Sequence, residues 1–433
     1  MRQSLCIIGG GLAGCEAAWQ AAKLGVPVCL FEMRPATMTP AHKTGNLAEL
    51  VCSNSLRGDA LENAVGLLKE EMRRLGSLVM EAAKACRLPA GGALAVDREN
   101  FSGFIEEKLT RHPLIELKME NITNFDSDEL TIIAAGPLAS PGLCRALEEI
   151  TGGRLFFHDA IAPIVERDSI DLNRAFFASR YGKGQADYLN CPMNKEEYLR
   201  FWQALRGAEL YPLHDFEDEK SFEGCLAVET MAARGPDTLR YGPLKPVGLE
   251  LPGGGEAYAV VQLRQDNAAA TAYNLVGFQT RLRRGEQERV FRLIPGLEKA
   301  VFIRYGMMHH NTYLDSPRLL ASDLSFKNRP NLFLAGQISG VEGYVESAAG
   351  GLVAGINAAR RHLGQEPLIW PFETAIGGLI NYLLTPRENF QPSNITFALL
   401  PPLERRIRDK REKNRAIAAR ALEAIEQFVI CNA

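Results

Sequence analysis

Apolar runs alternate with a helical pattern at the start of the chain. Residues 5–8 are apolar, residues 12–24 carry small and apolar residues at helical spacing, and residues 26–31 are apolar again. Short, continuous apolar runs are typical of strands buried on both faces, and parallel strands need a crossover helix between them. The pattern therefore predicts a strand, a helix and a second, parallel strand, the unit that opens a doubly wound α/β sheet.

The turn between the first strand and the helix is rich in glycine and reads Gly9, Gly10, Gly11, Leu12, Ala13 and Gly14. The first glycine of such a motif permits a tight turn, the second lets the backbone approach a pyrophosphate, and the third lets the helix pack closely. The helix N-terminus adds amide donors and partial positive charge. Glu32 lies 18 residues beyond Gly14, at the end of the second strand, and can accept hydrogen bonds from a ribose. A plain glycine turn is the alternative, but the complete context favours a dinucleotide site.

Two later apolar runs also end in small residues. Residues 130–133 lead into Ala134-Ala135-Gly136, and residues 331–334 lead into Ala335-Gly336, ahead of small residues at 347–359. In this order they resemble the glutathione-reductase type of FAD fold, in which the last helix points its N-terminus at the flavin. An S-adenosylmethionine fold would not predict the late segment. We therefore expect FAD, with Gly336 beside the flavin.

The composition changes between about residues 151 and 301, where glycine-rich turns and alternating runs such as 257–263 replace the α/β pattern. Glycine-rich segments and alternating runs of this kind indicate turns and strands. We expect an α/β protein with a discontinuous FAD-binding Rossmann domain, residues 1–150 and 301–433, and an inserted α+β substrate domain, residues 151–300.

Composition excludes several classes of protein. Hydrophobic residues make up 46% and charged residues 23%, which argues against a disordered or disulfide-stapled chain. No run approaches the roughly 18 apolar residues that a membrane helix needs. The net charge of −3 excludes a basic surface over the whole chain, so a nucleic acid would need a local patch. Candidates for such a patch are Arg281, Arg283, Arg284 and the charged stretch at 404–415, although a stretch of this kind is usually a solvated helix face.

The nine cysteines include no Cys-x-x-Cys pair, which suggests a reducing compartment, and we expect the cytoplasm. The seven histidines have no ligand spacing, and we expect no metal. Cys52 lies in a polar loop near Arg57, which is a candidate to hold a thiolate, and Cys225 lies in the predicted inserted domain. Position alone does not make either cysteine a nucleophile. Three others, on the predicted strands and helix, are most simply core residues: Cys6, Cys15 and Cys29.

Taken together, the sequence blocks resemble the folate- and FAD-dependent tRNA uracil-5-methyltransferases (TrmFO). The blocks run in order from about residue 5 to residue 357, and they are long and unusual enough to make chance similarity implausible. Larger relatives that modify the wobble uridine share the opening glycines but carry an additional helical C-terminal domain, for which this chain is too short. The matching blocks are residues 9–14, 31–35, 38–42, 51–56, 89–98, 187–193, 245–249, 261–265, 310–314 and 340–344.

The resemblance implies C5-methylation of the T-loop uridine, position 54, of tRNA. The carbon would come from 5,10-methylenetetrahydrofolate, and FAD reduced by NADPH or NADH would supply electrons. The two catalytic cysteines of the family correspond to Cys52 and Cys225. A thiolate that adds to C6 of uracil makes C5 nucleophilic, and a second group must remove the C5 proton. We assign Cys225 as nucleophile and Cys52 as its partner, either as the base or as a group that acts on the flavin-bound methylene, and the reverse assignment stays open.

The implied partners are the T-arm of tRNA and folate, with no membrane; the oligomeric state is open, a monomer included. Three rival functions remain. The same chemistry on ribosomal RNA is not separated by these blocks. A plain FAD-dependent NAD(P)H oxidoreductase would need neither folate nor RNA. A non-enzymatic flavin-containing RNA-binding protein is the least favoured. Such a protein would tolerate the loss of both cysteines, whereas this chain has both Cys52 and Cys225.

Overall fold

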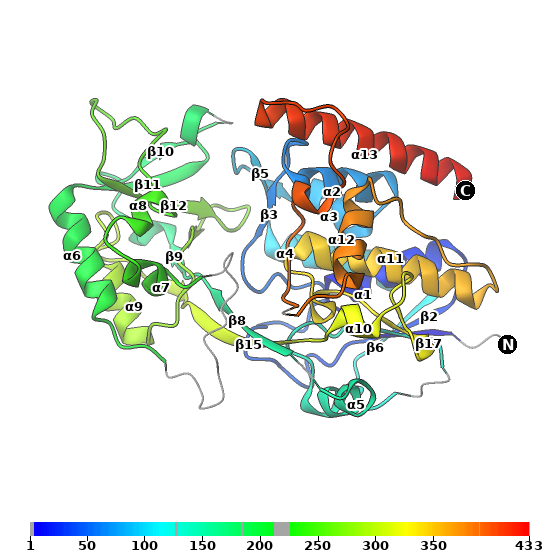
Figure 1. Ribbon diagram of the computed structural model, residues 1–433. Helices are drawn as coiled ribbons and strands as arrows, with labels where there is room; N and C mark the ends of the chain where they lie inside the picture. The colour runs from blue at the N-terminus through cyan, green and yellow to red at the C-terminus, as the bar shows by residue number, and fades with distance from the viewer. Residues whose placement is uncertain are drawn as a thin grey trace.

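The computed structural model describes residues 4–125, 129–153, 155–182, 185–211, 226–388 and 390–432. Two separate hydrophobic cores organise these residues. The larger core holds residues before 148 and after 312, and the smaller one holds residues from 162 to 302. In Figure 1 the smaller body lies on the left and the larger one on the right.

The larger body is built on a six-stranded sheet. Its strands lie in the order β16-β17-β7-β1-β2-β6, and all neighbours are parallel except β16 and β17. The apolar runs predicted as strands form this sheet, which confirms the α/β fold class. The strands are β1 (Leu5–Ile8), β2 (Val28–Phe31), β6 (Ile115–Lys118), β7 (Thr131–Ile133), β16 (Ser325–Phe326) and β17 (Arg329–Leu334).

Helices and a small sheet cover the parallel sheet. In Figure 1, α1 and α11 lie above it and α5 lies below. The helices of this body are α1 (Leu12–Lys23), α2 (Ala64–Arg74), α3 (Leu78–Ala85), α4 (Arg98–Thr110), α5 (Pro141–Thr151), α10 (Ser316–Leu319), α11 (Tyr344–His362), α12 (Ala375–Leu384) and α13 (Lys410–Asn432). The small antiparallel sheet consists of β3 (Ser55–Gly58), β5 (Ala93–Val96) and β4 (Arg87–Leu88).

Helices α1 and α11 approach each other closely because glycine lines their contact. A Cβ atom at Gly351 would lie 2.1 Å from the carbonyl oxygen of Ala13, and one at Gly355 would lie 2.5 Å from that of Ala17. Distances this short are sterically forbidden, so both positions require glycine. The run of small residues at 347–359 is thus explained by backbone-to-backbone packing of the two helices.

The smaller body is an antiparallel sheet of order β10-β11-β12-β13-β9-β14, with helices packed against it. The alternating run at 257–263 falls mostly within β12, as predicted. The strands are β9 (Ile164–Glu166), β10 (Phe176–Ala178), β11 (Tyr188–Met193), β12 (Ala259–Gln265), β13 (Ala272–Leu275) and β14 (Phe302–Arg304). The helices are α6 (Lys195–Arg206), α7 (Val228–Ala233), α8 (Thr238–Tyr241) and α9 (Arg284–Phe291).

A two-stranded antiparallel ribbon, β8 (Leu155–Ile161) with β15 (Met307–Tyr313), runs between the two bodies (Figure 1). The chain therefore enters and leaves the smaller body along neighbouring strands. Together with the two cores, this connection supports the division near residues 150 and 300, which we keep as a proposal.

Ion pairs hold helix α13 against the larger body. Arg411 and Arg415 pair with Glu62, and Arg74 pairs with Glu426. The side chains of Arg411 and Arg415 remain 71% and 59% exposed, as expected for a solvated helix face. Among the described residues, no helix has the length and apolarity needed to span a membrane.

Because Gly351 has no room for a side chain, we expect Gly351→Ala to lower the free energy of unfolding by about 1–3 kcal/mol. Urea denaturation measures this change. Gly103→Ala is the matched control, because Gly103 lies in α4 with no atom within 4 Å of an added Cβ. Alanine at position 103 should instead stabilise the protein by about 0.5–1 kcal/mol. Equal stabilities for Gly351→Ala and the wild type would contradict the packing argument.

Candidate active site

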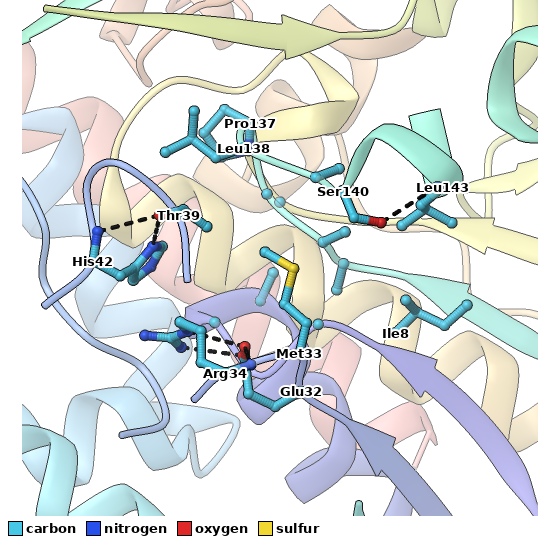
Figure 2. A pocket seen from close by; sticks show the side chains of 18 of the residues that line it. Ile8, Glu32, Met33, Arg34, Thr39, His42, Pro137, Leu138, Ser140 and Leu143 are labelled. Atoms are coloured by element: carbon cyan, nitrogen blue, oxygen red, sulfur yellow. Dashed lines mark hydrogen bonds and ion pairs between the residues drawn. The ribbon is translucent and has the colours of Figure 1, made fainter. Parts of the chain in front are cut away.

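A cavity opens at the carboxyl ends of β1, β2, β7 and β17 and encloses about 990 Å³, part of it open to solvent. Figure 2 shows Glu32 and Arg34 on one side and Pro137, Leu138 and Ser140 on the other. Ligands of open α/β sheets bind at this edge. Of the predicted cofactor-binding residues, the following line the cavity: Gly9, Gly11, Leu12, Ala13, Glu32 and Gly336.

The glycine turn shapes the base of this cavity. Gly9 has φ +112°, and a Cβ atom there would lie 2.5 Å from the carbonyl oxygen of Ala134. A Cβ atom at Gly14 would lie 1.8 Å from the carbonyl oxygen of Gly9. Gly11 differs, because a Cβ atom there would meet nothing within 4 Å and would project where the cavity needs space. Helix α1 follows with no side-chain cap and no acidic residue in its first turn. Its N-terminal amides are therefore available to an anion.

Glu32 is buried and is held by two neighbours. Its carboxylate accepts hydrogen bonds from the amide of Gly10 at 3.0 Å, from the amide and Nε of Arg34 at 2.9 Å each, and from Nη2 of Arg34 at 3.1 Å. Burial opposes ionisation of Glu32, but Arg34 and Gly10 together hold the pKa of its carboxyl below the ordinary value. A ribose hydroxyl would have to share a carboxylate oxygen with one of these donors, because four bonds already occupy the two oxygens.

Arg34 also contacts the loop that follows β2. Its Nη1 donates to Glu49 at 3.1 Å and to the carbonyl oxygen of Thr44 at 3.3 Å. The sequence motif led us to Glu32 but not to Arg34, although residues 31–35 form one of the matched blocks. Two of the predicted residues act behind the cavity wall: Gly10 binds Glu32, and Gly14 packs on Gly9.

The loop that carries Cys52 lies beside the cavity, and three arginines bind it. Arg98, at the start of α4, donates to the carbonyl oxygen of Leu50, and Arg304, in β14, donates to that of Val51. Arg264, in β12, donates to Oγ of Ser53 at 2.7 Å and to Oδ1 of Asn54 at 3.0 Å. Arg264 and Arg304 belong to the smaller body, so both bodies position this loop.

Tyr344, the first residue of α11, connects the same loop to the cavity. Its hydroxyl oxygen accepts hydrogen bonds from the amide of Cys52 at 2.6 Å and from that of Ser53 at 3.2 Å. Burial and then the nearby Cys52 raise the pKa of Tyr344 above its ordinary value, so the phenol stays protonated. Tyr344 and Val51 both line the cavity, which brings the cysteine loop to its wall.

Positive charge surrounds half-buried Cys52. Burial lowers the pKa of Arg264 and of Arg304, and Cys52 acts on both in the opposite direction. Burial also opposes the charge on Arg98, but Asp266, Tyr344 and Cys52 raise its pKa. Asp266 pairs with Arg98 at 3.0 Å. Guanidinium groups next to a cysteine favour its thiolate, which is the nucleophilic form.

The other cysteines of the parallel-sheet core are in a different environment. Burial raises the pKa of Cys6 to about 12 and raises that of Cys15 and Cys29 as well. These thiols therefore stay protonated at neutral pH, as expected of core residues. Arg57, the sequence candidate for holding a thiolate, pairs instead with Glu346 on α11. Cys225 lies outside the described residues.

No spacing rule pointed to Arg98, Arg264, Arg304 or Tyr344 as neighbours of Cys52. Three of them lie within matched sequence blocks: Arg98 in 89–98, Arg264 in 261–265 and Tyr344 in 340–344. Arg304 lies in no matched block, so nothing in the sequence indicated it. Of the arginines suggested for RNA, Arg283 pairs with Glu209 at 3.3 Å and Arg284 lies over the ring of Tyr305. Among the described residues, no group of three or more His, Cys, Asp or Glu is placed to hold a metal ion.

Comparison with known proteins identifies the family. The model of the family described as glucose inhibited division protein A matches residues 4–366. The methylenetetrahydrofolate--tRNA-(uracil-5-)-methyltransferase TrmFO of Moorella thermoacetica is 62% identical over 426 residues, which cover 98% of both chains. The protein of the same name from Desulforudis audaxviator is 61% identical over 433 residues, which cover 99% of both. The chain belongs to the TrmFO family. The resemblance inferred from the sequence blocks is thereby confirmed.

The solved structure of Aquifex aeolicus GidA in its form II crystal has the same fold as this TrmFO family member. The TM-score is 0.73 at 17% sequence identity, and the match covers 98% of this chain and 73% of the other. Identity this low supports the shared fold alone. The predicted Rossmann architecture with a second, inserted body is consistent with it.

Tyr344→Phe tests how this TrmFO family member holds its cysteine loop. Removing the hydroxyl leaves the amides of Cys52 and Ser53 without their acceptor, which costs about 1–3 kcal/mol locally. We expect hydrogen exchange in a peptide spanning residues 50–55 to become at least about tenfold faster. Tyr382→Phe is the control, since its hydroxyl donates to the carbonyl oxygen of Gln391, away from the loop. Unchanged exchange at residues 50–55 would show that Tyr344 does not fix the loop.

Proposed function

We propose that this chain methylates C5 of the T-loop uridine, position 54, of tRNA, with the carbon taken from 5,10-methylenetetrahydrofolate. The observation that carries this proposal is the position of the Cys52 loop at the wall of the glycine-lined cavity. It occurs in a chain 62% identical, over nearly its whole length, to a protein named as a folate-dependent tRNA uracil-5-methyltransferase. The T-loop position rests on the family resemblance.

The cavity has residues suited to the pyrophosphate, the ribose and the flavin end of FAD. Gly11 leaves room for backbone approach, and the uncapped N-terminus of α1 offers amides to the pyrophosphate. Glu32 and its partner Arg34 stand at the end of β2, where the ribose of a dinucleotide is bound. Gly336, Gln337 and the start of α11 lie at the cavity wall near Cys52 and would hold the flavin end.

The reaction needs two electrons, because the transferred methylene must become a methyl group. Reduced FAD would supply them when bound, and NADPH or NADH would restore its reduced state. The residues of this chain have other tasks: the loop of Cys52 must present a thiol at the cavity wall, and the three arginines must keep that loop and its charge in place. Water must also be excluded, and the apolar cavity walls around Leu138 and Leu143 serve this purpose.

Two thiols divide the work on uracil. In our assignment, Cys225 adds to C6 of the ring, which places electron density on C5 and lets C5 bond to the methylene carbon as one bond of that carbon to a folate nitrogen breaks. Cys52 then takes the proton from C5, and the electron pair expels the remaining folate nitrogen from the methylene carbon. A hydride, the two electrons that reduced FAD would supply when bound, makes this carbon a methyl group, and the thiolate of Cys225 leaves C6 as the ring recovers its C5–C6 double bond. Arg98, Arg264 and Arg304 favour the ionised form of Cys52, which a base requires.

Positive charge beside the cavity suits anionic substrates. Burial and the guanidinium groups of Arg304 and Arg98 lower the pKa of Lys43, a neighbour in sequence of the cavity-lining His42. Both tRNA and folate are anions, so a local concentration of cations compensates for the overall charge of −3. None of the described cysteines forms a disulfide, in keeping with a reducing compartment, and we propose that the reaction takes place in the cytoplasm.

A methylation assay tests the function. The protein receives methylenetetrahydrofolate labelled at the methylene carbon, NADPH and an unmodified tRNA transcript. We expect label at the T-loop uridine, and a loss of at least about 100-fold in both Cys52→Ser and Cys225→Ser, because each removes a group that acts on the ring.

Cys431→Ser is the control for cysteine substitution, since Cys431 is exposed near the end of α13. It should methylate at the wild-type rate. Label that appears only on a ribosomal RNA fragment would replace the tRNA assignment. NADPH oxidation without label on any RNA would favour the plain oxidoreductase.

Gly11→Val tests the site of FAD. The added side chain would enter the space that the pyrophosphate needs, yet it would meet no protein atom near its Cβ. We expect the purified variant to contain less than about a tenth of the wild-type flavin, by absorbance. Because bound flavin itself stabilises the folded state, the variant's free energy of unfolding in urea is compared with that of wild-type protein stripped of flavin and should stay within about 1 kcal/mol of it. Full flavin content in Gly11→Val would place the cofactor elsewhere.

A further inference from the structure

One row of side chains crosses the antiparallel sheet of the smaller body. Residues directly opposed in neighbouring antiparallel strands share a face, and the register aligns five of them. In order across the strands they are Arg304, Ile164, Asn274, Arg264 and Tyr188. This face is turned toward the larger body, because Arg304 and Arg264 bind the Cys52 loop and Tyr188 donates to the carbonyl oxygen of Ala90 at 3.1 Å.

Asn274 lies in this row between the two arginines that hold the loop. Arg304 binds Val51 and Arg264 binds Ser53, so the two arginines hold the loop at the residues on either side of Cys52. Asn274 is only 3% exposed. Its side-chain nitrogen nevertheless has no hydrogen-bond partner among the residues that the structure describes. An unsatisfied buried donor destabilises the folded state and is rare in folded proteins, so its presence calls for an explanation.

The backbone of the loop is already bonded. Arg98 and Arg304 bind the carbonyl oxygens of Leu50 and Val51, and Tyr344 binds the amide of Cys52. The sulfur of Cys52 is the atom of this loop whose strength as a hydrogen-bond acceptor changes when it ionises. A thiol is a weak acceptor, whereas an anionic sulfur accepts a charge-assisted hydrogen bond, about twice as strong as a neutral one.

We propose that Asn274 is a positioning residue whose side-chain amide donates a hydrogen bond to the sulfur of Cys52 when that sulfur is ionised. The amide is kept unsatisfied in the thiol form, and ionisation supplies its acceptor. The proposal deepens the proposed function, since it explains how the base of that reaction is held ready, and it concerns a property that Cys52 has without any substrate.

The test is the pH dependence of alkylation at Cys52. The protein, as purified with its flavin, reacts with iodoacetamide between pH 6 and pH 10, and mass spectrometry follows the peptide that contains Cys52. In Asn274→Leu, the midpoint of the rate profile should rise so that alkylation near neutral pH slows about tenfold. In Asn274→Asp, a carboxylate replaces the donor and the midpoint should rise further.

The other charged or titratable groups near Cys52 are the same in all of these variants. They are Arg98 from α4, Arg264 and Asp266 from the β12 region, Arg304 from β14 and Tyr344 from α11. Asn190→Leu is the matched control. Asn190 is a buried amide on the same face, but its nitrogen donates to the carbonyl oxygens of Phe176, Ala178 and Tyr188. Its loss should lower stability and leave the Cys52 profile unchanged.

A purely structural Asn274 predicts the reverse. Replacement of an unsatisfied donor by leucine of similar volume would then raise the melting temperature and leave the profile at the wild-type midpoint, and this result would overturn the proposal. A shifted profile in both Asn274 variants supports it. Because alkylation needs neither tRNA nor folate, failure of the methylation assay and failure of this proposal are separate outcomes.

Discussion

The architecture depends on backbone-to-backbone contact between elements that meet at one edge of the parallel sheet. Gly14 rests on Gly9, and Gly351 and Gly355 rest on α1, at distances that exclude any side chain. These contacts bring the first turns of α1 and α11 to the same cavity. Helix α1 contributes amides and partial positive charge there, so a steric constraint among small residues determines where an anionic cofactor can bind.

A second level of organisation is electrostatic and connects the two bodies. The loop from Leu50 to Asn54 has almost no regular structure of its own, and its conformation is set by Arg98, Arg264, Arg304 and Tyr344. Arg264 and Arg304 come from the sheet of the smaller body, so the contact between the two bodies at this loop is polar and charged.

The sequence allowed the α/β fold and the glycine motif to be predicted because they depend on local signals. Apolar runs ending in glycine identify buried strands, and small residues at helical spacing identify a helix that packs closely. The environment of Cys52 could not be predicted in this way. Arg264 and Arg304 are more than 200 residues away from the loop in sequence, and strand register across an inserted sheet brings them to it. Arg57, the nearest arginine in sequence, pairs with Glu346.

The dependence of the loop on Arg264 and Arg304 limits how freely the smaller body could be exchanged for another domain. The smaller body is joined to the larger one along one ribbon, as an interchangeable module would be. It is not interchangeable chemically, because its sheet must present two arginines in register with the Cys52 loop. Any domain put in its place would therefore have to reproduce these few hydrogen bonds.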